Sequence, residues 1–125
     1  MSEYIQHDFD ILHENDVLRI TLSGAIDDAS AHQITTEAIS VAAAHDLTHF
    51  LYDLREAQLD MGITELYSLP RQFPASRTHR IAALIKKDDT NRDNWQFLEN
   101  VERNMGIQMQ LCTSEQEALA WLTRR

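Results

Sequence analysis

The stretch Leu51-Tyr-Asp-Leu-Arg-Glu-Ala-Gln-Leu-Asp-Met-Gly-Ile-Thr-Glu-Leu66 decides how this chain folds. Its first residues, with Phe50 before them, form a short apolar run that ends at an acid, which is typical of an interior parallel strand over 50–54. After a short loop, Asp60-Met61-Gly62 opens a helix that we expect to end before Pro70. The stretch therefore predicts a strand, a loop and a helix of a parallel α/β domain.

Upstream of this stretch, apolar and polar residues alternate. The alternation covers 4–12 and 17–23, with a polar turn between them, and it predicts an N-terminal antiparallel hairpin. The period then changes to that of a helix over 31–45, where small and aliphatic residues form one stripe. Asp27, Asp28 and Ser30 are good capping residues for this helix, and Ser30 with Gln33 fits a capping box.

Downstream, further elements follow at short intervals. The residues 81–85 form a second buried strand, 92–105 have the spacing of an amphipathic helix, and 107–111 alternate as a strand near a sheet edge does. A capping box at 114–117 begins a last helix. The order ββαβαβαβα predicts an α/β fold in a single domain over 1–125: a mixed, mostly parallel five-stranded sheet with an N-terminal hairpin and about four helices.

The overall composition narrows the class of protein. The 125 residues suffice for one domain, and 43% hydrophobic with 25% charged residues is usual for a soluble globular protein. A net charge of −9 argues against nucleic-acid binding. The first residues lack the pattern of a secretory signal, and the single Cys112 suits a reducing compartment, so we expect a cytoplasmic location.

Three short motifs give the chain a resemblance to a known family. They are Leu22-Ser-Gly24 before the first helix, Tyr52-Asp-Leu-Arg55 in the central strand, and Glu117-Ala-Leu-Ala-Trp-Leu122 in the last helix. In this order and spacing the chain resembles STAS domains, the SpoIIAA-like proteins. The resemblance covers nearly the whole chain from about residue 17 and implies the SpoIIAA-like fold and a regulatory binding function.

The chain departs from the family pattern in the loop after the central strand. The anti-sigma-antagonist members carry Asp-Ser-Ser/Thr-Gly-Leu after the central strand, with a serine that is phosphorylated to control partner binding. The matching residues here are Asp60-Met61-Gly62-Ile63, one residue shorter and without the hydroxyl. The closer resemblance is therefore to the divergent branch of the family, which implies apolar or lipid-like ligands and approach to membranes.

The turns at 24–28 and 60–64 are our predicted recognition surface for a protein partner. Both follow parallel strands, so they should lie at the same end of the sheet, where open α/β folds bind ligands. The start of the second helix also offers free N–H groups and a positive dipole end, unless Asp60 simply caps the helix. The predicted partner-binding residues are Gly24, Ile26, Asp27, Asp60, Met61, Gly62 and Thr64.

The segment 66–77 supports an alternative function, a carrier or sensor of an apolar or lipid-like ligand that touches a membrane. It begins a block from 66 to 87 that holds five cations and no acid. Such a block suits an anionic membrane, or it is a solvated loop of an acidic protein. We expect Ile63 and Leu66 to pack on the sheet. The predicted membrane or apolar-ligand residues are Tyr67, Leu69, Arg71, Phe73 and Arg77.

The titratable residues predict neither catalysis nor a metal site. Asp53 and Arg55 should face the same side of their strand and form a structural ion pair. The run 89–93 begins like a calcium loop but lacks its glycine and final glutamate, so helix capping explains it better. We expect a non-enzymatic protein without cofactor or metal. A homodimer is also plausible, through a sheet edge at the alternating strands 4–12 and 107–111 or through a helix face, and the sequence does not choose between them.

Overall fold

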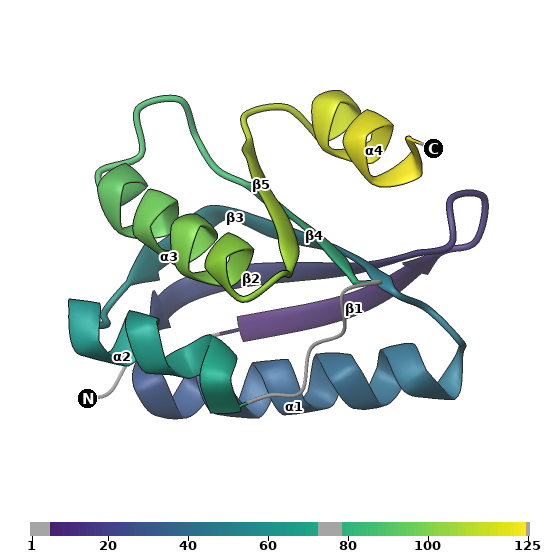
Figure 1. Cartoon of the computed structure of the whole chain (residues 1–125). Helices are drawn as coiled ribbons and strands as arrows, with labels where there is room; N and C mark the ends of the chain where they lie inside the picture. Colours follow the sequence, from purple (N-terminus) through teal and green to yellow (C-terminus); the bar gives the residue numbers. More distant parts are fainter. Residues whose placement is uncertain (1–5, 73–78, 125) are drawn as a thin grey trace.

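A computed structural model describes residues 6–72 and 79–124 of the chain (Figure 1). The elements follow the predicted order ββαβαβαβα. The strands are β1 Gln6–Leu12, β2 Val17–Ile26, β3 His49–Leu59, β4 Arg80–Leu84 and β5 Gln108–Cys112. The helices are α1 Asp28–Ala44, α2 Ile63–Ser68, α3 Arg92–Asn104 and α4 Glu115–Thr123, and the 3-10 turn η1 Leu69–Gln72 directly follows α2.

The five strands form one sheet in the order β1-β2-β3-β4-β5. Strand β1 is antiparallel to β2, and every other neighbouring pair is parallel. This confirms the mixed, mostly parallel sheet with an N-terminal hairpin. Strands β1 and β5 lie at the edges, as their alternating sequences predicted.

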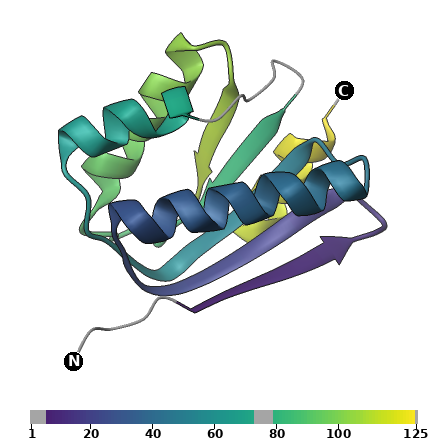
Figure 2. The same cartoon turned by 90° about the horizontal axis from the view of Figure 1, so that it is seen from below.

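Helices cover both faces of the sheet. Helices α1, α2 and α3 contribute Ile34, Leu66 and Leu98 to a hydrophobic core on one face. Helix α4 packs on the other face, where Leu122 meets Leu51 of β3. Seen from below, α1 lies in front of the sheet and α4 behind it (Figure 2). The sheet is therefore buried on both sides over the first half of β3 and over β4, which explains the short apolar runs at 50–54 and 81–84.

Strands β2 and β3 are longer than the sequence pattern predicted. They remain paired as far as Ile26 and Leu59, whereas the prediction ended them at 23 and 54. In the second half of β3, Arg55, Glu56 and Gln58 are exposed, so this half does not read as a buried strand. A shift of register in the pairing with β2 also interrupts the simple alternation.

Two helix boundaries also differ from the prediction. Helix α1 begins at Asp28, because Asp27 rather than Ser30 is its N-cap and Ser30 closes the capping box. After α2, the chain continues in a helical conformation through Pro70, where the prediction had ended the helix. Pro70 lies in the first turn of η1, where its missing N–H is not needed. The stop predicted after α3 holds, since Gly106 has a φ of 84°.

Candidate functional site

The ends of β2 and β3 bring the two predicted recognition turns together. Ile26 and Leu59 are paired in the parallel ladder, and the N–H of Asp60 donates to the carbonyl of Ile26 at 2.8 Å. The chain segments 24–28 and 60–64 therefore lie side by side at one end of the sheet. This confirms their predicted adjacency.

At the first of these segments, Asp27 acts as a helix cap. Its carboxylate accepts from the N–H of Ser30 at 2.8 Å and from the Ser30 hydroxyl. These hydrogen bonds, the one from the side chain first, hold the pKa of Asp27 below its usual value. The carboxylate is thus a fixed negative charge on the surface whose hydrogen-bonding capacity is partly used by α1.

The second segment differs from the predicted helix entrance. Gly62 is the N-cap of α2, so Asp60 lies two residues before the cap and does not cap the helix. The Glu65 carboxylate accepts from the N–H of Gly62 at 3.0 Å. Since α2 has only six residues and an acid already occupies its first turn, an anion is poorly accommodated there. Thr64 is exposed on the first turn.

Two predicted partner-binding side chains face inward. Ile26 is 5% exposed and Met61 is 7% exposed, and both belong to the core on the α1 face. Their side chains therefore pack beneath the predicted recognition surface and are not available to contact a partner. Met61, in particular, is an apolar residue that is buried in the core.

Gly24 lies inside β2 and has a φ of 97°, a backbone conformation that side chains with a Cβ rarely adopt. The positive φ therefore explains why a glycine stands at the end of the Leu22-Ser-Gly24 motif. We expect Gly24→Ala to lower the free energy of unfolding by about 1–2 kcal/mol. Urea unfolding measures this, with Ser23→Ala as the neighbouring control at about 0.5 kcal/mol or less. Equal effects of the two changes would show that the backbone at Gly24 is unstrained.

Helix α2 exposes two large apolar side chains. Ile63 is 55% exposed and Tyr67 is 50% exposed, one helical turn apart. The Arg71 guanidinium lies 3.8 Å from the centre of the Tyr67 ring and donates to the Tyr67 carbonyl at 2.7 Å. We call Ile63, Tyr67 and Arg71 the α2 patch. Leu66 is buried as predicted, but the prediction that Ile63 packs on the sheet is wrong.

The rest of the predicted 66–77 surface divides into two parts. Leu69 is half-buried and packs against the core, so it contributes less surface than predicted. Phe73 and Arg77 lie outside the described residues. Of the predicted membrane-facing set, Tyr67 and Arg71 are the exposed residues among those that the structure describes.

The predicted ion pair between Asp53 and Arg55 is confirmed and is part of a larger network. The Asp53 carboxylate accepts from Arg55 Nη2 at 2.8 Å and from Arg19 Nη2 of β2 at 2.8 Å, while Arg19 also pairs with Glu115 at the start of α4. Burial alone would raise the pKa of Asp53, but the hydrogen bonds and charge of Arg55, with the charge of Arg19, outweigh it and lower the pKa. This arrangement ties β2, β3 and α4 together.

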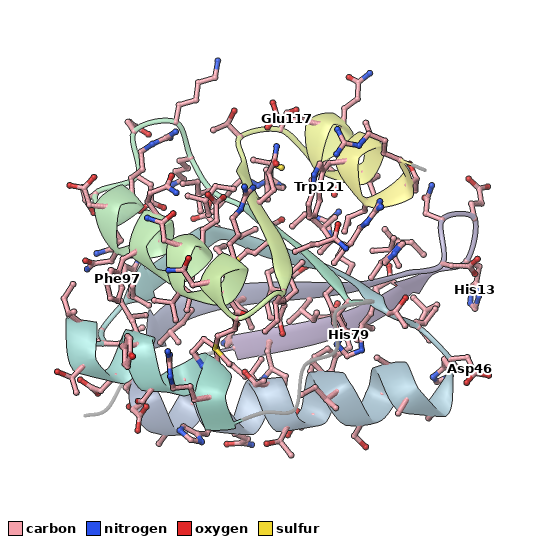
Figure 3. All side chains as sticks on the ribbon, viewed as in Figure 1. His13, Asp46, His79, Phe97, Glu117 and Trp121 are labelled. Carbon is pink, nitrogen blue, oxygen red and sulfur yellow. The ribbon has the colours of Figure 1, made fainter. Side chains whose placement is uncertain are left out.

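A cavity of about 140 Å³ lies between the sheet and helices α1, α2 and α3. Its wall is mostly aliphatic and aromatic, with Ile34, Phe50, Leu66 and Trp95 among the lining residues. His79 also lines it and makes an edge contact with Phe50 at 5.4 Å between ring centres. Figure 3 places His79 between the sheet and α1, and Trp121 on the other side of the sheet at α4.

Two titratable residues of this cavity were not predicted from the sequence. Burial raises the pKa of Glu102 to about 7. Burial, and then the Glu102 carboxyl, raise the pKa of Tyr52 above its usual value. A signal was present in the sequence, because Glu102 has the helical spacing of the apolar residues Trp95, Leu98 and Met105.

The remaining polar motifs have structural explanations. Asp89 accepts from the N–H of Asn91 at 2.7 Å, and Asn91 in turn accepts from the N–H of Leu59 at 3.1 Å, so the 89–93 run shapes the start of α3 and holds the end of β3. Cys112 is buried as predicted, and burial raises the pKa of its thiol to about 12. Within residues 6–72 and 79–124, no three His, Cys, Asp or Glu side chains cluster as metal ligands.

In the part of the chain that the structure describes, no helix combines the length and the apolar character needed to cross a bilayer.

Comparisons with known proteins support the fold. No family model and no curated protein sequence matches the chain. An uncharacterized DUF3478-family protein with a SpoIIAA-like fold from Shewanella loihica superposes at a TM-score of 0.63 with 15% identity over 98% of both chains. An anti-sigma factor antagonist from Mycobacterium paratuberculosis gives a TM-score of 0.63 with 16% identity, covering 95% of this chain and 94% of that one.

A third solved structure agrees with these two. The anti-sigma factor antagonist SpoIIAA in its unphosphorylated form gives a TM-score of 0.57 with 20% identity, covering 96% of this chain and all of that one. At such identities the likeness concerns the fold. Together with the strand order, it shows that this chain has the SpoIIAA-like fold.

Proposed function

We propose that the chain is a non-catalytic regulatory module that binds a protein partner through the α2 patch and the adjoining segments 24–28 and 60–64. The observation that carries this proposal is the exposure of Ile63 and Tyr67 on adjacent turns of α2. Aromatic and aliphatic side chains surrounded by polar residues are typical of the centre of a protein interface. Solved proteins of the same fold are named as antagonists of anti-sigma factors, which are proteins.

The charges near the α2 patch favour a particular kind of partner. Asp27, Asp28, Asp60 and Glu65 are close to it in the fold or in the sequence, whereas Arg71 is engaged with Tyr67. A protein surface with apolar side chains inside a basic rim would complement these acids. An anionic membrane would be repelled by them.

The residue at the family's switch position changes how such binding is regulated. Met61 has no hydroxyl and is 7% exposed, so it offers no phosphorylation site. Partner binding by this chain is therefore independent of phosphorylation at residue 61. Control by the amount of the partner or by another ligand would take its place.

A crosslinking experiment tests the partner surface. A photoreactive amino acid at Tyr67 should crosslink one defined protein in the native cells, which mass spectrometry identifies and purified components then confirm. The same amino acid at Met105, which is 36% exposed at the end of α3, is the matched control. Identical crosslinks from both positions would contradict the proposal.

Substitution of the patch then measures its contribution. Tyr67→Ala should weaken binding of the identified partner by about 30-fold, since a central aromatic side chain contributes about 2 kcal/mol. Met105→Ala should leave the dissociation constant within about twofold. Isothermal titration calorimetry measures the dissociation constant for both variants. An unchanged dissociation constant for Tyr67→Ala would mean that the interface lies elsewhere.

The second candidate function is a carrier or sensor of an apolar or lipid-like ligand, with peripheral membrane contact through 66–77. The specific observation in its favour is the cavity of about 140 Å³. The membrane half of this alternative depends on Tyr67 and Arg71, which are the same residues as in the partner surface. A homodimer, through a sheet edge at β1 or β5 or through a helix face, stays a prediction for either function.

A further inference from the structure

The cavity between the sheet and helices α1, α2 and α3 lies beneath the partner surface, because Ile26 and Met61 line it from inside, and its lining does not include the Asp53 network. An engineered protein cavity of about 150 Å³ with an aliphatic and aromatic lining accommodates benzene. The volume of about 140 Å³ is close to that value. The space therefore suits a molecule of about six to nine non-hydrogen atoms. The long acyl chains of a phospholipid do not fit in it.

Two polar atoms of the cavity residues lack a hydrogen-bond partner among the described residues. They are Nε1 of the Trp95 indole and Oε2 of the Glu102 carboxyl, and both atoms are buried. Native proteins seldom leave such atoms unpaired, because their lost hydration is not replaced. The two residues lie about two turns apart on α3, or about 10 Å along its axis. They would therefore contact different parts of one bound molecule.

The chemistry of these atoms defines the polar groups of a ligand. The Trp95 N–H donates only, so it requires an acceptor. The Glu102 carboxyl accepts from a donor when ionised, and when protonated it also donates. A hydroxyl or amine on a small ring can pair with the carboxyl, and an oxygen or π-face can receive the indole N–H.

The charges around Glu102 disfavour an anionic ligand. Tyr52 from β3 and His79 before β4 line the cavity with it, and burial lowers the pKa of His79, which favours its neutral form. On α3, the Arg103 guanidinium donates to the Met109 carbonyl at 2.9 Å and lies 3.9 Å from Glu99. No cation of the described cavity wall therefore balances a ligand carboxylate.

We propose that this cavity binds a compact aromatic or cycloaliphatic molecule that is neutral or cationic and that pairs its polar groups with Trp95 and Glu102. The inference rests on the second candidate function and narrows its ligand from lipid-like molecules to one- or two-ring compounds. It also assigns Trp95, Glu102 and Tyr52 to ligand binding. The proposal of partner binding at the α2 patch does not depend on a ligand in this cavity.

The test follows the indole N–H resonances of the protein by NMR with ¹⁵N labelling. Benzyl alcohol and benzylamine are the probes, benzoate is the anion of similar size, and palmitate represents lipid-like ligands. The chain has two tryptophans, so Trp121 on α4 is an internal control for Trp95. Benzyl alcohol and benzylamine should shift the Trp95 resonance saturably and leave that of Trp121 unchanged. Benzoate should bind at least tenfold more weakly.

Two neighbouring alanines of β4 supply matched variants. Ala83 lines the cavity and is 1% exposed, while Ala82 is 0% exposed on the opposite face of the sheet. Ala83→Val should fill part of the cavity and weaken benzyl alcohol binding at least tenfold. Ala82→Val should leave binding unchanged. If Ala82→Val does not fold, Ala120→Val on the exposed side of α4 replaces it as the control.

The outcomes separate this inference from the function on which it rests. Saturable binding of palmitate without binding of the ring compounds would overturn the inference and support the lipid-like carrier. Binding of benzoate as tight as that of benzyl alcohol would overturn the charge argument. If no probe shifts Trp95 up to its solubility limit, both the inference and the carrier function fail.

Discussion

Replacing Asp53 with alanine should lower the free energy of unfolding by about 3 kcal/mol, as expected when one partner of a largely buried ion pair is removed. The Asp53 side chain is 9% exposed, and that of Arg19 is 20% exposed. Without the carboxylate, two guanidinium groups are left facing each other in a poorly hydrated place. The loss should also loosen α4, because Arg19 contacts Glu115 of that helix.

The matched control is Glu56→Ala on the same strand. Glu56 also has a cationic partner, Lys86 at 3.8 Å, but its side chain is 75% exposed. Exposed ion pairs contribute about 0–1 kcal/mol, so this variant should unfold nearly like the wild type. Urea unfolding at pH 7 measures both changes. If Glu56→Ala lowers stability as much as Asp53→Ala does, burial of the network is not what makes it stabilising.

Asp53 also makes the stability of the protein depend on pH in the acidic range. Its folded-state pKa is lower than the unfolded value of 3.8, so the ionised carboxylate stabilises the fold above that value. This stability is lost as the pH falls through the folded pKa. Asp53→Asn has no carboxylate to protonate, and its unfolding free energy should therefore fall less between pH 5 and pH 3 than that of the wild type.

The parts of this network differ in how far the sequence could predict them. Asp53 and Arg55 are two residues apart on one strand, and period-2 alternation is enough to place them on the same side. Arg19 lies on another strand, and its contact with Asp53 depends on the parallel pairing of β2 with β3 and on their register. A register shift of one residue would turn Arg19 to the opposite face. Its place in the network was therefore not predictable.

The candidate partner surface shows a similar division. The adjacency of the turns at 24–28 and 60–64 follows from two parallel neighbouring strands, which the apolar patterns predict. The exposure of Ile63 does not follow from a pattern, because Ile63 and Leu66 have the spacing of one buried helix face. Helix α2 has only six residues, and only Leu66 of these is buried. How such a short helix is oriented depends on its neighbours.

Substitution of Glu102 tests the polar half of the ligand proposal directly. The Glu102 pKa of about 7, compared with 4.5 when exposed, means that the folded state holds a proton that the unfolded chain releases. Stability therefore falls as the pH rises from about 4.5 to about 7. By pH 8 the loss amounts to about 3 kcal/mol. Glu102→Gln should remove this loss and make the protein more stable than the wild type at pH 8.

The control for Glu102→Gln lies on the same helix. The Glu99 carboxylate is also buried, but it accepts from the N–H of Leu111 at 2.7 Å and from Gln96 at 2.7 Å. Glu99→Gln should therefore destabilise the protein by about 1 kcal/mol, because it weakens charge-assisted hydrogen bonds. The two variants should change stability in opposite directions at pH 8. If both destabilise it, the Glu102 carboxyl is already satisfied in the folded protein, and the polar half of the ligand proposal loses its basis.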